Sequence, residues 1–191
     1  MTGSVSTPRL RATFAIYLAL IAAAAFIGPP NVESWSYYVA GAVGFLCVAL
    51  ACLGRIWCSV FIAGRKDAML VTTGPYAACR HPLYSLSVLG ALGLGLTTRS
   101  PLLCTVTVLA ILALVLVAAA REEKALALAF PAAYAAYVAA TPNKWWPATA
   151  RPLPDRIDVH PALYWKAFLD AGSFFLLWLL VAAATEYRLS M

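Results

Sequence analysis

Charged side chains are scarce in this chain: only 12% of its 191 residues are Asp, Glu, Lys or Arg, whereas 63% are hydrophobic. An ordinary soluble domain carries about 25% charged residues, and a disordered tail is also richer in polar groups, so the composition excludes both classes. The net charge is +6, but no basic and aromatic pattern indicates nucleic-acid binding. The scarcity of charge therefore points to lipid as the surrounding medium.

The five cysteines lack the paired spacing of a zinc site or a disulfide framework, so we expect no metal centre and thiols that pack as small apolar groups. Cys79 stands beside Arg80, and a cation can lower a thiol pKa, but the sequence offers no resolving partner, so we expect no chemistry at this thiol either. The chain also lacks a long linker, a low-complexity tail and an internal repeat. We therefore expect a single membrane domain over residues 1–191.

What the chain has instead is five apolar blocks, each predicted to cross a hydrocarbon core that needs roughly 20 helical residues per pass. Backbone polar groups in lipid must be satisfied within the segment, so the predicted fold is an all-α integral membrane protein of about five transmembrane helices. The first block is interpreted as an uncleaved helix, since no polar cleavage region follows its alanines. The blocks are Thr13–Gly28, Ser36–Ala63, Pro82–Thr97, Leu102–Ala120 and Tyr164–Ala184, the last predicted as a helix over about residues 163–185.

The basic residues gather on one side of this topology. Because positive charge stays in cytoplasmic loops, the N-terminus and the long connection before the fifth block are predicted to face the cytoplasm. The other side receives only Arg99 and Arg188. The basic residues on the cytoplasmic side are Arg9, Arg11, Arg65, Lys66, Arg80, Arg121, Lys124, Lys144, Arg151, Arg156 and Lys166.

Two polar clusters interrupt the apolar pattern, and both fall on the predicted cytoplasmic side. The first is Arg80-His81-Pro82-Leu83-Tyr84, and the second, about 35 residues later, is Arg121-Glu122-Glu123-Lys124. A helix starting after Ser100-Pro101 and continuing to Ala140 would be nearly 60 Å long, about twice the hydrocarbon thickness, so its second half must project from the membrane.

In that projecting half, five side chains follow one another at spacings of four, four, four and three residues, which would place them along one face of a helix. An ordinary amphipathic helix gives the same spacing, and Pro131 should bend the helix. The stripe consists of Glu122, Leu126, Phe130, Tyr134 and Tyr137.

Glutamates and tyrosines on one side, and Arg80 with a helix start on the other, predict a pocket with a cation site and an anion site. Arg55 lies inside the second apolar block, where it would either pair with Glu122 or Glu123 or extend to the membrane surface. His81 alone could equally be a helix cap with a satisfied ring. A cationic zwitterion fits such a pocket, and S-adenosylmethionine is one such molecule among others.

In the same order, several motifs of this chain resemble those of the isoprenylcysteine carboxyl methyltransferase family and of the related phospholipid amine methyltransferases. The resemblance covers about residues 55–147. Two features depart from it: Phe130-Pro131 replaces the usual Phe-Gly, and a fifth helix follows. The motifs are Leu70-Val71-Thr72-Thr73-Gly74-Pro75-Tyr76, Arg80-His81-Pro82-Leu83-Tyr84, Glu122-Glu123 with the stripe described above, and Lys144-Trp145-Trp146-Pro147.

The resemblance implies an S-adenosylmethionine-dependent methyltransferase with a cytoplasmic cofactor pocket and a lipophilic acceptor entering from the bilayer. It implies that Tyr76, His81, Leu83, Tyr84, Tyr134, Tyr137 and Trp146 bind the cofactor, and that Glu122 and Glu123 bind it or position the acceptor. Arg55 and Arg80 are the further candidate catalytic residues.

The residues leave the acceptor open. A carboxylate or thiolate could be oriented by Arg55 or Arg80, whereas an ammonium would need a base such as Glu122 or Glu123. The fifth helix could reshape the substrate entrance or support a homodimer. Two other classes remain open: a sterol-reductase-like enzyme that uses a nicotinamide cofactor, and a non-catalytic scaffold or lipid-binding protein.

Overall fold

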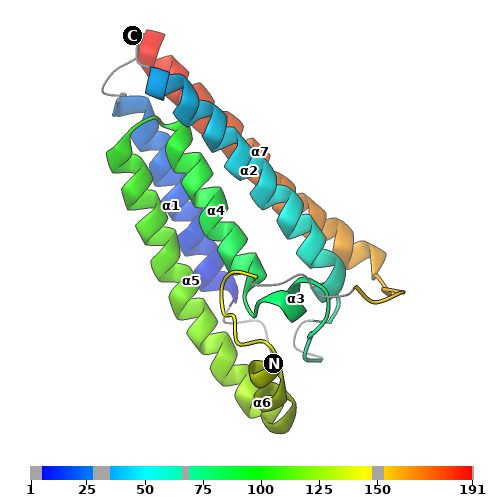
Figure 1. The fold of residues 1–191 in the computed structure, drawn as a ribbon. Helices are drawn as coiled ribbons and strands as arrows, with labels where there is room; N and C mark the ends of the chain where they lie inside the picture. The colour runs from blue at the N-terminus through cyan, green and yellow to red at the C-terminus, as the bar shows by residue number, and fades with distance from the viewer. Residues whose placement is uncertain (1–5, 28–34, 66–68, 148–152, 191) are drawn as a thin grey trace. The chain divides into compact units, whose positions relative to one another are not determined.

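Every regular element described in the computed structural model is an α-helix (Figure 1). The structure describes residues 6–27, 35–65, 69–147 and 153–190. Within these ranges the helices are α1 (Ser6–Phe26), α2 (Trp35–Ile62), α3 (Pro75–Ala78), α4 (Pro82–Thr97), α5 (Pro101–Ala129), α6 (Pro131–Ala140) and α7 (Pro161–Ser190).

The predicted all-helical fold is confirmed, but the count of five crossings is not. Among the described residues, three helices are long and apolar enough to cross a membrane: α2, α5 and α7. The other two predicted spans correspond to α1 and α4, whose apolar stretches Arg11–Phe26 and Pro82–Thr97 are shorter. The predicted end of the first block at Gly28, and the predicted cytoplasmic cations Lys66 and Arg151, lie outside the described residues.

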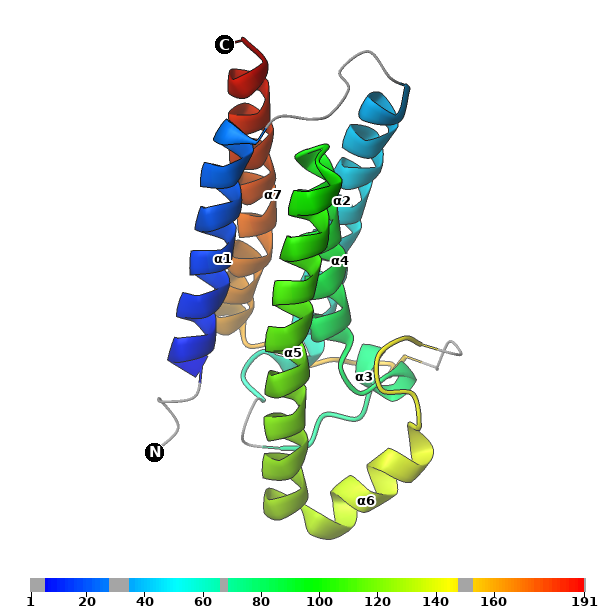
Figure 2. The same ribbon diagram turned by 90° about the vertical axis from the view of Figure 1, so that its left-hand side faces the viewer.

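Proline marks the first residue of five of the helices, α3 to α7. Proline suits this position because its fixed φ is already helical and its missing N–H would have no helical partner. Pro131 also explains why the long helix is broken: α5 ends at Ala129, Phe130 adopts a non-helical conformation, and α6 begins in a new direction (Figure 2). The predicted bend at Pro131 is therefore confirmed, and the stripe beyond Glu122 is divided between two helices.

The chain forms two compact units. Unit 1 comprises residues 1–51, 87–116 and 173–191, and unit 2 comprises residues 52–86 and 117–172.

In unit 1, glycine allows helices to approach closely. A Cβ on Gly44 would lie 2.8 Å from the carbonyl oxygen of Gly93, so α2 and α4 meet backbone to backbone. A Cβ on Gly90 would collide with the ring of Phe174, and one on Gly95 with Cys104. Small residues at such crossings are typical of helix packing in lipid, where dispersion contacts supply most of the attraction.

In unit 2, a small apolar core lies under the turn that precedes α3. Cys58, Phe61 and Tyr76 are buried together, with Leu83 packed against them. Gly74 has φ of 59°, and a Cβ there would lie 2.2 Å from the Phe61 ring. Only glycine satisfies both the backbone conformation and the space, so Gly74 fixes the turn that delivers Tyr76 and the residues after it.

Candidate functional site

Glu123 of α5 is the centre of a charged cluster in unit 2. Its Oε1 lies 3.1 Å from Nε2 of His81 and 3.3 Å from Nη1 of Arg80. Its Oε2 accepts a hydrogen bond of 2.8 Å from Nζ of Lys144. The structure thus brings the two predicted polar clusters together and adds Lys144, the first residue of the Lys-Trp-Trp-Pro motif.

Backbone hydrogen bonds hold the segment before α4 against the segment after α6. The amides of Arg80 and His81 donate to the carbonyls of Asn143 and Lys144, each at 3.0 Å. Ser85 Oγ donates to the carbonyl of Trp145 at 2.6 Å. The position of the His81 ring is therefore set by main-chain contacts as well as by Glu123.

Aromatic rings surround His81. The ring of Tyr84 is stacked on it with centroids 5.4 Å apart, and the ring of Trp145 lies 5.5 Å away. Tyr84 also donates a hydrogen bond of 2.7 Å from its hydroxyl to Oε2 of Glu122. Glu122 is thereby oriented beside the histidine, next to its neighbour Glu123.

The tyrosines of α6 tie that helix to the rest of unit 2. The hydroxyl of Tyr137 donates to the carbonyl of Tyr76 at 2.7 Å, inside the protein. Tyr134 is buried and its hydroxyl accepts a hydrogen bond from Arg80. Both predicted tyrosines therefore reach the site, although from a helix separate from the one that carries Glu122.

The hydroxyl of Tyr76 is buried without a hydrogen-bond partner among the described residues. A buried polar group left unpaired costs about 1–3 kcal/mol, so such a group calls for an explanation. Leu83 packs against the same apolar core as the Tyr76 ring.

Burial shapes the protonation of these groups. It lowers the pKa of His81 from its ordinary value of 6.5, against the opposing effect of the hydrogen bond to Glu123. A neutral His81 then donates from Nε2 to the carboxylate. Burial raises the pKa of Tyr76 and of Tyr137 above the ordinary value of 10, so both phenols stay protonated. It also raises the pKa of Cys79, so the neighbouring Arg80 does not activate this thiol.

Arg55 has a partner that the sequence analysis missed. Its Nη2 donates to Oδ2 of Asp170, on α7, at 2.7 Å. This ion pair joins α2 to a residue 115 positions further along the chain, and it was neither of the two alternatives that the sequence analysis left open. Local spacing carries no signal for such a pair, although Asp170 is an acidic residue within an apolar helix, and that alone marks it as unusual.

Two further residues of the cluster were not predicted as site residues. Trp145 contacts the His81 ring, whereas Trp146, predicted to bind the cofactor, has 61% of its surface exposed. Lys144 forms an ion pair with Oε2 of Glu123. Both missed residues belong to the Lys-Trp-Trp-Pro motif, so the motif itself was the signal that could have found them.

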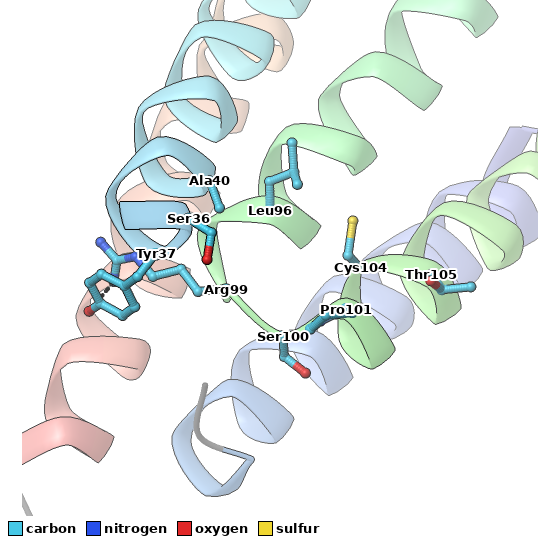
Figure 3. A pocket seen from close by; sticks show the side chains of 9 residues that line it. All are labelled: Ser36, Tyr37, Ala40, Leu96, Arg99, Ser100, Pro101, Cys104 and Thr105. Carbon is cyan, nitrogen blue, oxygen red and sulfur yellow. Dashed lines mark hydrogen bonds between the residues drawn. The ribbon is translucent and has the colours of Figure 1, made fainter. Parts of the chain in front are cut away.

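A separate cavity of about 390 Å³ lies in unit 1, and none of the predicted site residues lines it (Figure 3). Beside it, the guanidinium of Arg99 lies 4.0 Å above the ring of Tyr37 and donates to Glu186 at 2.7 Å. The lining residues are Ser36, Tyr37, Ala40, Leu96, Arg99, Ser100, Pro101, Cys104 and Thr105.

Comparison with known proteins bears on the charged cluster of unit 2. Residues 37–128 match the Isoprenylcysteine carboxyl methyltransferase (ICMT) family. The resemblance to this family is confirmed. The ICMT match includes His81, Glu122, Glu123 and Arg55, and it ends before Tyr134 and all later residues of the site.

Two curated relatives support the match. The chain is 46% identical over 100 residues to the cobalt-zinc-cadmium resistance protein CzcN of Cupriavidus metallidurans, covering 52% of this chain and 46% of the relative. It is 45% identical over 91 residues to the nickel-cobalt-cadmium resistance protein NccN of Alcaligenes xylosoxydans xylosoxydans, covering 48% of this chain and 42% of the relative. The aligned part thus spans slightly less than half the length of each. No solved structure matches the chain.

Proposed function

We propose that this protein is a membrane methyltransferase that uses S-adenosylmethionine as methyl donor and a lipophilic molecule from the bilayer as acceptor. The observation that carries the proposal is the convergence of His81, Tyr84, Glu122 and Trp145 on one site of unit 2, where His81, Tyr84 and Glu122 lie within the ICMT match. ICMT-family members use S-adenosylmethionine, and that activity is what we assign to this site.

The chemistry of the cluster fits this cofactor, which has a sulfonium, an ammonium, a carboxylate and an adenine. The carboxylate of Glu122 suits a cationic group of the cofactor. Its described hydrogen bond, donated by the Tyr84 hydroxyl, uses one of its oxygens, Oε2. The rings of His81, Tyr84 and Trp145 offer faces for an adenine or a sulfonium. The unpartnered hydroxyl of Tyr76 is a polar atom that a bound ligand would satisfy.

Glu123 has a different proposed role. Arg80, His81 and Lys144 already surround its two oxygens, so a further cation would gain little there. We assign Glu123 to holding the segments before α4 and after α6 together, and Glu122 to the ligand. Leu83, Tyr134 and Tyr137 would then support the walls of the site, and Trp146 is assigned to the adenine by the resemblance alone.

When bound, the cofactor supplies a methyl group on a sulfonium, whose C–S bond breaks with its electron pair left on sulfur as a nucleophile takes the methyl. The residues of the chain would align the acceptor and exclude water, and no covalent intermediate with the protein is required. The two relatives are named for resistance to divalent metals. Within the described residues no three His, Cys, Asp or Glu side chains form a metal site, and we assign this chain methyl transfer rather than metal binding.

The test is calorimetric binding of S-adenosylmethionine and of its demethylated product to the detergent-purified protein. We expect saturable binding that Glu122→Ala weakens by about tenfold or more, because a charge partner of the ligand is lost. His81→Ala should weaken binding as well. Glu186→Gln, which removes a carboxylate of unit 1 outside the site, is the matched control and should bind normally. Well-folded protein that binds neither molecule would sink the proposal.

A further inference from the structure

The segment that follows α6 is held in place by another part of the chain. Residues 141–147, which we call the strap, have no regular secondary structure. The backbone of such a segment needs hydrogen-bond partners outside the segment, and three consecutive carbonyls of the strap find them at the start of α4. The donor and acceptor residues are Arg80 N–H with Asn143 and His81 N–H with Lys144, each at 3.0 Å, and Ser85 Oγ with Trp145 at 2.6 Å.

Among these three donors, Ser85 is the one that uses its side chain. It lies in the first turn of α4 and is only 5% exposed. Its Oγ is 3.3 Å from the carbonyl of His81 but 2.6 Å from that of Trp145, so the strap receives the stronger hydrogen bond. Because the hydroxyl is buried and donates its proton to the main chain, Ser85 acts through the strap and not by contact with a ligand.

The strap carries an aromatic ring to the candidate site. The ring of Trp145 lies 5.5 Å from that of His81, between centroids. Nζ of Lys144 lies 5.6 Å from the Trp145 centroid and also pairs with Glu123. The position of the strap therefore decides where the Trp145 ring and the Lys144 charge lie. The ICMT match ends at residue 128, so this arrangement of the strap is not part of the match.

We propose that Ser85 is a positioning residue of the cofactor site, whose hydroxyl holds the strap so that the Trp145 ring stays beside His81 as one wall of that site. This inference rests on the proposed methyltransferase function and concerns how the site retains its methyl donor. Without the hydroxyl, the Trp145 carbonyl loses its donor, which favours opening of the strap. An open strap takes the Trp145 ring away from the site, so Ser85→Ala should weaken binding of the methyl donor.

Hydrogen exchange of the full chain in detergent micelles tests the position of the strap without any ligand. The amides of Arg80 and His81 are suitable reporters, because their acceptors are strap carbonyls. We expect Ser85→Ala to raise their exchange rates about two- to tenfold, the factor that one lost hydrogen bond accounts for. Mass spectrometry of peptides that contain both amides measures this change. Unchanged exchange would overturn the inference.

Calorimetric binding of S-adenosylmethionine tests the consequence for the site. Ser85→Ala should raise Kd by about two- to tenfold. Ser59→Ala is the matched control, because Ser59 is 6% exposed and donates at 2.7 Å to the carbonyl of Arg55, one turn earlier in its own helix. It removes an equally buried hydrogen bond without altering the strap, and it should exchange and bind like the parent. Equal weakening of binding in both variants would overturn the inference.

A double variant shows whether Ser85 acts through the ring. Trp145→Ala removes the ring and keeps the carbonyl, and we expect it to weaken binding by itself. Adding Ser85→Ala should then weaken binding little further, because the ring that Ser85 positions is absent. Two effects that simply add would overturn the inference.

The exchange and binding results separate this inference from the proposed function. Faster exchange in Ser85→Ala with unchanged binding would overturn the inference and leave the proposed function standing. A well-folded parent protein that binds no S-adenosylmethionine would end the proposed function, and the inference with it.

Discussion

At the scale of the residue, His81 shows how burial and a carboxylate set one protonation state. Burial lowers the pKa of His81 below 6.5, so the folded protein binds fewer protons there than the unfolded chain as the pH falls through this range. The contribution of neutral His81 to stability is thus fully present above pH 6.5 and is lost progressively below it. We expect the unfolding temperature of the purified protein to fall between pH 7.5 and pH 5.5.

Other groups titrate in the same range, so the comparison requires a variant. His81→Gln keeps a hydrogen-bond donor near Glu123 and removes the titration. Its unfolding temperature should fall less over the same interval than that of the parent. The groups facing His81, namely Arg80, Tyr84, Glu122, Glu123 and Lys144, remain in both proteins. Equal falls in both would show that His81 does not carry the effect.

The polar residues of the site were predictable because charged or polar side chains are rare within the apolar sequence of a membrane protein. His81, Glu122 and Glu123 interrupt apolar runs, and the structure does bring them together. The partner of Arg55 was not predictable, because a contact across 115 positions depends on how α7 packs in unit 2. Trp145 was missed in favour of Trp146, since adjacent residues point in different directions and the motif alone does not say which one faces His81.

At the scale of the element, the sequence predicts where helices begin better than which of them cross a membrane. The prolines correctly predicted the starts of α4 and α5 and the break before α6. The stripe through Tyr137 was only partly right, because it assumed one helical period across Pro131. The tyrosines are instead placed by tertiary contacts of the short helix α6, which no spacing rule contains.

The Tyr137 hydrogen bond is the contact that fixes α6. Its hydroxyl donates to the carbonyl of Tyr76 in a buried place, so Tyr137→Phe leaves that carbonyl without this donor. We expect a loss of about 0.5–1.5 kcal/mol in the free energy of unfolding, measured by chemical denaturation in detergent. Tyr38→Phe, at a position that is 62% exposed, is the control and should change stability little. An equal loss of unfolding free energy in both variants would mean that the buried hydrogen bond adds no stability beyond that of an exposed tyrosine hydroxyl.

At the scale of the whole molecule, the distribution of charge predicts an orientation. Eight of the 14 arginines and lysines fall in the first 11 residues and in the connections before α4 and before α7, whereas the connection between α4 and α5 and the end of α7 hold one each. Because positive loops remain in the cytoplasm, the loop that contains Thr72 is predicted to be cytoplasmic. The end of α7 near Tyr187 is then predicted to lie on the opposite side. A cytoplasmic site suits the proposed function, since the methyl donor is a soluble cytoplasmic molecule.

Single cysteines introduced at these two exposed positions can test the orientation. The native thiols are buried or half-buried, so the parent chain should react little with a membrane-impermeant maleimide. In intact cells we expect Tyr187→Cys, at a position that is 60% exposed, to be labelled at once. Thr72→Cys should be labelled only after the membrane is made permeable. The reverse pattern would place His81 and Glu122 away from the cytoplasmic methyl donor and would contradict the proposed function, whereas labelling of both in intact cells would contradict an odd number of crossings between the two positions.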